Sequence, residues 1–161
     1  MASLRVPTVG LSTVALALAL TSCAPSPTVN DVGYERIIGA VVLAESDAGG
    51  RAYAVEVDDD TVEVKVATGD RAVEIDVDLS GPTVTDRRDD ALDADDREAV
   101  TAAVTTLADG VRIAAAAHRG EGGISEVELR RDSETAWEIE FTDGGEVAVA
   151  VDDGAVLNAD G

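Results

Sequence analysis

Residues 53–78 read YAVEVDDDTVEVKVATGDRAVEIDVD, with three runs in which apolar and polar side chains alternate. Two short segments rich in Asp or Gly, at 58–60 and 68–70, separate the runs. Alternation with a period of two places the apolar side chains on one face of a strand, and such segments are typical of turns between antiparallel neighbours. The stretch therefore predicts a meander of half-buried antiparallel strands, with a fourth strand beginning at Val84.

A second copy of this plan follows at residues 126–152, which read EVELRRDSETAWEIEFTDGGEVAVAVD. The two stretches align at a spacing of about 74 residues, and self-similarity at a fixed spacing indicates an internal repeat. The matched pairs are Tyr53 with Val127, Val62 with Trp137, Val66 with Phe141, Gly69 with Gly144 and Asp78 with Asp152. The alignment predicts that one structural unit occurs twice along the chain.

A helix is predicted ahead of each set of strands. Apolar residues at 37–44 recur with helical spacing until the glycine pair at 49–50 ends the pattern. A second apolar stripe covers 100–114, and Asp93 can cap the helix that carries it. Gly110 is expected to kink this second stretch or to divide it into two helices.

The predicted fold class is α+β, with two tandem small units that each pack a helix on a three- to four-stranded antiparallel β-meander. The first unit is expected at 35–88 and the second at 109–161, with an acidic linker and helix at 89–108 between them. The helix covers the apolar face of the meander, because each element must bury its apolar side against another. Units of this size bury little surface alone, so we expect the two to pack together.

The first 22 residues have the pattern of a signal peptide. One positive charge precedes an apolar run, Val9 to Leu20, that is shorter than the ~20 residues of a membrane-spanning helix. The run closes with a motif that resembles the bacterial lipobox, made of Leu20, Thr21, Ser22 and Cys23. The resemblance implies that Cys23 carries a lipid on the outer face of the cell membrane, with 23–34 as a tether. A cleaved signal with an incidental cysteine, or an uncleaved anchor helix, would account for the same residues.

The chain is strongly acidic. It has 12 Lys and Arg against 33 Asp and Glu, a formal charge of −21, and removal of residues 1–22 takes away one Arg and no acidic residue. Nucleic acid and anionic lipid headgroups require clusters of Lys and Arg, so nucleic-acid binding is excluded. The charge favours a cationic partner, although the composition bias of a GC-rich genome would also produce it.

Glycine positions and strand motifs together resemble the PepSY domain over residues 35–160. The matching segments in the second unit are Ala114 to Ala117, Gly122-Gly123, Val127 to Leu129, Trp137 to Phe141, Gly144-Gly145, Val147 to Asp152 and Gly154 to Val156. Those in the first unit are Gly49-Gly50, Tyr53 to Val57 and Asp78 to Gly81. The pattern departs from the family at Ser80 and at a shortened Asp152-Asp153-Gly154. The resemblance implies an extracytoplasmic module that binds or restrains peptidases and has no catalytic residues.

The residues themselves offer little chemistry. His118 is the single histidine and is expected at a helix end, so zinc sites and nucleophilic dyads are not predicted. Trp137 and Phe141 share one face of one strand and are expected in the core, with a peptide-binding surface as the alternative. Weak calcium binding remains open at three aspartate clusters: Asp58 to Asp60, Asp86 with Asp89 and Asp90, and Asp93 with Asp95 and Asp96.

The sequence thus predicts a membrane-anchored, extracytoplasmic binding module with no enzyme activity, no cofactor and no specific metal site. Its expected partner is an envelope peptidase or a basic protein, captured as an added strand at an exposed sheet edge. The alternative is an acidic, calcium-binding envelope lipoprotein without a specific protein target.

Overall fold

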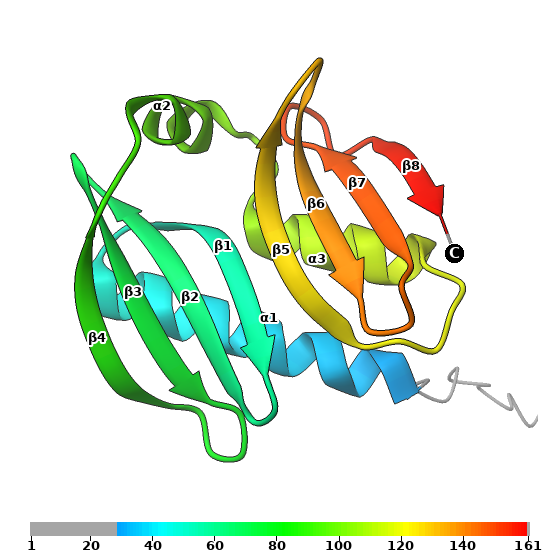
Figure 1. Cartoon of the computed structure of the whole chain (residues 1–161), viewed down its shortest axis with the longest axis horizontal. Helices are drawn as coiled ribbons and strands as arrows, with labels where there is room; N and C mark the ends of the chain where they lie inside the picture. The colour runs from blue at the N-terminus through cyan, green and yellow to red at the C-terminus, as the bar shows by residue number, and fades with distance from the viewer. Residues whose placement is uncertain (1–28, 161) are drawn as a thin grey trace, which may run out of the picture.

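The computed structural model describes residues 29–160 (Figure 1). The predicted signal peptide, the lipobox with Cys23 and the first residues of the tether lie outside this part of the chain. The predictions for those residues are therefore not tested by the fold.

Within the described residues, eight strands form one antiparallel sheet in the order β4-β3-β2-β1-β5-β6-β7-β8 (Figure 1). The helices are α1 (Val29–Ala48), α2 (Ala94–Ala102) and α3 (Leu107–Ala117). The strands are β1 (Arg51–Asp58), β2 (Thr61–Thr68), β3 (Arg71–Asp78), β4 (Thr83–Ala91), β5 (Ile124–Arg131), β6 (Thr135–Phe141), β7 (Glu146–Ala150) and β8 (Val156–Asp160). One meander, β1–β4, follows α1, and a second, β5–β8, follows α3.

The two meanders meet where β1 pairs with β5, at Val55 opposite Val127 and Glu56 opposite Glu126. The apolar cluster under the sheet is also continuous across this junction, with buried residues from α1, α3 and strands of both meanders. The predicted α+β class with an antiparallel sheet is confirmed. The division into two tandem units stays a prediction, because sheet and core run through both meanders.

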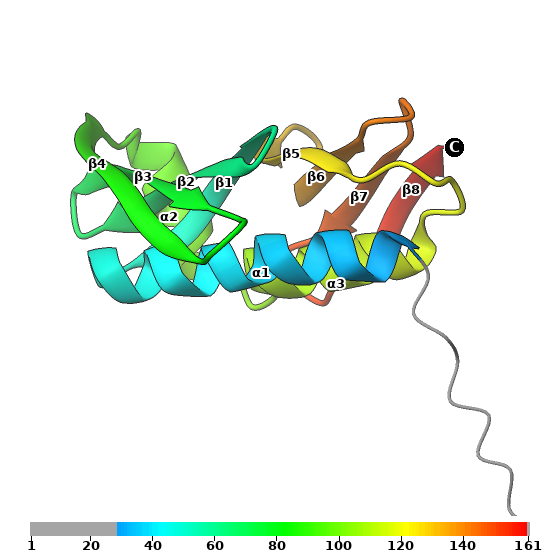
Figure 2. The ribbon, with the colours of Figure 1, turned by 90° about the horizontal axis from the view of Figure 1, so that it is seen from below.

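Helices α1 and α3 lie against the same face of the sheet (Figure 2). The strand residues on this face are apolar, and Val64, Ile75 and Ile139 among them are fully buried. Burial of each such side chain stabilises the fold by about 1.5–3 kcal/mol. We call the opposite side of the sheet the open face, and it carries the polar residues of the alternation.

A β-bulge in β1 interrupts the alternation that the sequence predicts. The register with β2 shifts within β1, so that Ala52 lies opposite Val66 while Val55 lies opposite Val64. Ala52 therefore takes the core position that an uninterrupted alternation assigns to Tyr53, and it is buried. Tyr53 itself stands at the bulge and is half-buried against the core, because a bulge adds one residue and shifts the alternation beyond it.

The strand pairing also corrects the alignment of the repeat. Val55 of β1 pairs with Val127 of β5. On its other side, Val55 lies opposite Val64 of β2, and Val127 lies opposite Ile139 of β6. Val64 and Ile139 correspond in the predicted repeat, so Val127 corresponds to Val55 and not to Tyr53. The two-residue difference arises because the connection between β5 and β6, with its turn at 132–134, is longer than that between β1 and β2, with its turn at 59–60, and a comparison of apolar positions does not show this.

The second helical stretch is divided, but not at Gly110. Helix α2 ends at Ala102, and α3 begins at Leu107 after a short irregular connection. Gly110 lies inside α3, where a Cβ would stand only 2.7 Å from Cδ1 of Trp137. The expected kink is therefore wrong, since Gly110 serves to let α3 approach the sheet closely.

We expect Gly110→Ala to destabilise the protein. Alanine would improve helix propensity by about 1 kcal/mol, but overpacking against a buried ring costs about 1–3 kcal/mol. The melting temperature should therefore fall, as followed by circular dichroism. Gly39→Ala in α1 is the matched control, because nothing lies within 4 Å of a Cβ there, and it should raise the melting temperature. Stabilisation by both changes would contradict the close contact.

Candidate binding surface

One acidic residue from each of the eight strands lies in a single row across the open face. Neighbours in this acid row are directly opposite each other in the strand register. From β4 to β8 the acid row consists of Asp86, Asp76, Glu63, Glu56, Glu126, Glu140, Glu146 and Asp160. Like charges in this position destabilise a sheet, so cations from the protein or from a partner would stabilise the acid row.

Arg88 on β4 pairs with carboxylates at one end of the acid row and offsets part of their charge. Its guanidinium donates hydrogen bonds to Asp86 at 2.7 Å, Glu63 at 2.8 Å, Asp76 at 3.1 Å and, beside the row, Glu74 at 3.1 Å. The hydrogen bonds that Arg88 donates to Asp76, Asp86 and Glu74 raise the pKa of its guanidinium further above its already high value. The part of the open face on β2, β3 and β4 is therefore paired within the protein.

The middle of the acid row lacks such compensation. Glu56, Glu126 and Glu140 from the row and the adjacent Glu128 gather where β5 lies between β1 and β6. None of these four residues, here called the acidic centre, forms an ion pair with another residue of the described chain. Burial raises the pKa of Glu126, and a hydrogen bond with Glu128 and the charges of the other three raise it further. Ionisation of Glu126 within the acidic centre therefore costs free energy.

We expect Glu126→Gln to raise the melting temperature, and to do so more strongly as the pH rises. The folded-state pKa of Glu126 lies above the usual 4.5, so the folded chain holds this proton more tightly than the unfolded chain. Its stabilising contribution is complete below pH 4.5 and is lost as the pH rises through the raised pKa. Thermal melts between pH 4 and pH 8 measure the difference.

The control for this prediction is Glu134→Gln, which makes the same charge change at an exposed turn between β5 and β6. Its effect should be smaller than that of Glu126→Gln at neutral pH. Equal effects of the two substitutions would show that net charge alone, and not the acidic centre, sets the stability.

His118 occupies the helix end predicted for it, and its backbone amide donates to the carbonyl of Ala114. The ring is almost fully buried and stacks on Phe141 with a centroid distance of 3.8 Å. Nε2 lies 3.1 Å from Oδ2 of Asp143. The amides of Gly145 and Gly122, and then His118, lower the pKa of Asp143. This cluster joins the loop after α3 to the β6–β7 turn and has a structural role that the sequence did not reveal.

The aspartate clusters considered for calcium lie at three places. One is the turn between β1 and β2, another is on β4, and the third is at the start of α2. Arg131 pairs with the third cluster, with a closest distance of 3.0 Å to Asp96. No group of three or more His, Cys, Asp or Glu between residues 29 and 160 is placed to hold a metal ion.

The aromatic strand residues lie in the core, as predicted. Trp137 is 1% exposed and Phe141 is 5% exposed. The indole Nε1 donates a buried hydrogen bond of 3.0 Å to the backbone carbonyl of Thr105, in the connection between α2 and α3. Trp137 therefore fixes the position of that connection, which the sequence pattern could not indicate.

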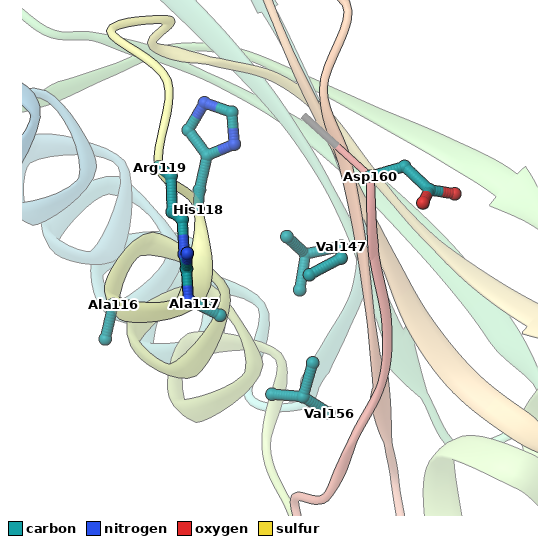
Figure 3. Close-up of a pocket in the computed structure, with 8 residues that line it drawn as sticks. Ala116, Ala117, His118, Arg119, Val147, Val156 and Asp160 are labelled. Atoms are coloured by element: carbon teal, nitrogen blue, oxygen red, sulfur yellow. The ribbon is translucent and has the colours of Figure 1, made fainter.

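A cleft of about 540 Å³ opens between the end of α3 and the edge strand β8. Its apolar lining consists of Ala116, Ala117, Val147, Val156 and Ala159. Val147 and Val156 point toward α3, whereas Asp160 points away from it (Figure 3). The cleft thus lies on the helix-covered side of β8, and Asp160, the last member of the acid row, borders it while its side chain is directed away from α3 (Figure 3).

No single helix in the described part of the chain is long and apolar enough to cross a membrane. Helices α2 and α3 pass such a test only as a pair bent by 73°. Their apolar residues Val100, Leu107 and Val111 are buried, so packing within the protein accounts for them.

The fold and surface define an α+β protein with one broad antiparallel sheet, helices on one face and a charged open face. No protein-family model matches the sequence, and no curated protein matches it either. Among solved structures, the chain is similar to a candidate lipoprotein from Clostridium difficile 630. The match has 18% sequence identity, covers 75% of this chain and 89% of the other, and has a TM-score of 0.44. The resemblance to the PepSY domain stays a prediction from the motifs.

Proposed function

We propose that this protein is a lipid-anchored, extracytoplasmic binding module built from two tandem PepSY-like units, with no catalytic role. It binds a basic surface of an envelope protein, and the expected partner class is a peptidase that the module restrains. The anchor is a lipid on Cys23, at the end of the lipobox-like motif.

The single observation that carries this proposal is the acidic centre. Four carboxylates from β1, β5 and β6 lie together without a basic partner in the described chain, although Arg88 compensates the adjoining part of the same face. A partner that supplies Lys or Arg would offset the cost of ionising Glu126, and charge complementarity of this kind speeds association and gives specificity. Ionised Glu126 lowers the stability of the free protein. The same charge becomes favourable when a basic residue of a partner binds beside it.

The alternative of a calcium-binding lipoprotein receives no support from the geometry. The described residues contain no group arranged as a metal site, and Asp89, Asp93 and Asp96 already pair with arginines.

The test is affinity capture with the full lipidated chain, coupled to beads in detergent and exposed to native envelope extract at low salt. We expect a small number of proteins to be recovered and then released by raised salt, with mass spectrometry to identify them. A triple variant with Glu126, Glu128 and Glu140 replaced by Gln should bind the recovered protein about tenfold more weakly, which corresponds to about 1.4 kcal/mol.

The matched control replaces Glu98, Glu121 and Glu134 by Gln. These exposed residues lie off the open face, and the net charge changes equally, so affinity should stay within twofold of wild type. Equal loss in both variants would overturn the role of the acidic centre. The anchor is tested separately by labelled palmitate, which should enter the wild-type chain and not Cys23→Ala.

A further inference from the structure

We propose that the outer edge of β8 binds an extended peptide segment of a partner as a ninth strand. The segment alternates apolar side chains, which enter the cleft beside α3, with Lys or Arg side chains, which lie at the end of the acid row. This inference rests on the proposed binding function and names the surface and the chemistry of its ligand.

The two edges of the sheet differ sharply. The edge strand β4 exposes five consecutive charged residues, Asp86 to Asp90. Its arginines pair with Asp47 on α1 and with acidic residues of the neighbouring strands. Charged side chains of this kind protect an edge against addition of another strand. The β4 edge is therefore unsuited to strand addition.

Strand β8 has the opposite character. Its sequence VLNAD contains one charge, at Asp160. Val156 and Leu157 are large apolar residues that remain 44% and 38% exposed. An edge strand also presents backbone N–H and C=O groups without partners in the sheet. The β8 edge thus offers both hydrogen bonds and apolar contact to an added strand.

The cleft determines the side chains on one face of the ligand. The residues of α3 next to β8 are Ala116 and Ala117, and their small side chains leave space above Val147, Val156 and Ala159. Alternate residues of an added strand point to this side of the sheet. Arg119 lies at the same cleft and disfavours a second positive charge there, so the ligand residues on this side are apolar.

The acid row determines the other face of the ligand. Asp160 lies opposite Glu146 in the register and is directed away from α3 (Figure 3). A ninth strand would place its intervening residues beside Asp160, where opposite charges directly across strands are favourable. A second copy of this chain would bring a formal charge of −21 and its own acid row to the same edge. The occupant is therefore a basic partner segment and not a second copy.

The probe is the peptide Val-Lys-Val-Lys-Val-Lys-Val, blocked at both ends and labelled for fluorescence anisotropy against the full chain in detergent. Its control has the same composition in blocks, Lys-Lys-Lys-Val-Val-Val-Val. We expect the alternating peptide to bind at least about tenfold more tightly, because only alternation serves both faces of an added strand. Equal affinity of the two peptides would overturn the strand-addition mode.

The protein side is tested with Val156→Lys, which should weaken binding of the alternating peptide by about tenfold by placing a charge at the cleft. Val42→Lys is the matched control, since Val42 is 54% exposed on α1 and the charge change is identical; its affinity should stay within twofold. Hydrogen exchange on the wild-type chain gives a second measurement. The peptide should protect amides of 156–160 and leave those of 83–91 unchanged, and protection of β4 alone would refute the assignment.

The outcomes also separate this inference from the proposed function. If both peptides bind equally and the Gln triple variant of the acidic centre loses both, the binding function stands and the β8 assignment fails. If neither peptide binds and affinity capture recovers nothing, the proposed function fails as well.

Discussion

Replacing Trp137 with alanine is expected to lower the free energy of unfolding by about 3–5 kcal/mol, the usual cost of removing a large buried aromatic side chain. The indole is 1% exposed, and α3 approaches it so closely at Gly110 that the neighbouring backbone has little freedom to fill the cavity. The substitution also removes the hydrogen bond to the carbonyl of Thr105. Urea unfolding followed by circular dichroism measures the change.

Trp137→Phe separates the two contributions. It keeps most of the buried ring but leaves the Thr105 carbonyl without the Nε1 donor, so we expect a smaller loss, about 1–3 kcal/mol. The dependence of the free energy on urea should be unchanged in both variants if only native stability changes. A loss below 1 kcal/mol for Trp137→Ala would contradict the central place of the indole in the core.

Replacing Arg88 with methionine is expected to lower the melting temperature by several degrees at low salt. The change removes the guanidinium that bonds Asp86, Glu63, Asp76 and Glu74, and it would leave the β4 end of the acid row as uncompensated as the acidic centre. The loss should shrink in 1 M salt, where the Debye length is about 3 Å. Thermal melts at several salt concentrations test both statements.

Arg71→Met is the matched control for Arg88→Met. Arg71 also lies on the outer part of the sheet, but it forms a single exposed ion pair, 3.6 Å from Asp89. Exposed pairs of this kind contribute little, so the melting temperature should change only slightly. A similar loss in the two variants would mean that Arg88 acts as an ordinary surface charge and that the acid row carries no special cost.

Arg88→Met and Glu126→Gln should therefore shift stability in opposite directions on the same face. The first change adds to the unbalanced negative charge, and the second reduces it. A partner that supplies positive charge at the acidic centre would act in the same sense as Glu126→Gln. The stability of the complex should then exceed that of the free protein by mass action.

The sequence by itself was sufficient to predict most elements of this fold, although not strand β8 or the start of α1 within the predicted tether. The alternation at Val62 to Val66 and at Val73 to Val77 predicted half-buried strands, and the spacing of apolar residues predicted the long helices. These patterns are local, because the side-chain period of a strand or a helix follows from its own backbone geometry. For the same reason the core position of Trp137 and the helix-end position of His118 were predicted correctly.

Only the tertiary structure decided which residues meet. Glu56 and Glu126 are far apart in the sequence and become neighbours because β1 pairs with β5. The role of Gly110 depends on a tryptophan from another strand, and the partner of His118 is Asp143 from a distant turn. The acid row, the acidic centre and the open edge at β8 all follow from strand order and from bulges that shift the register. Local periodicity cannot supply this information, because it determines which way a side chain points and not what lies beside it.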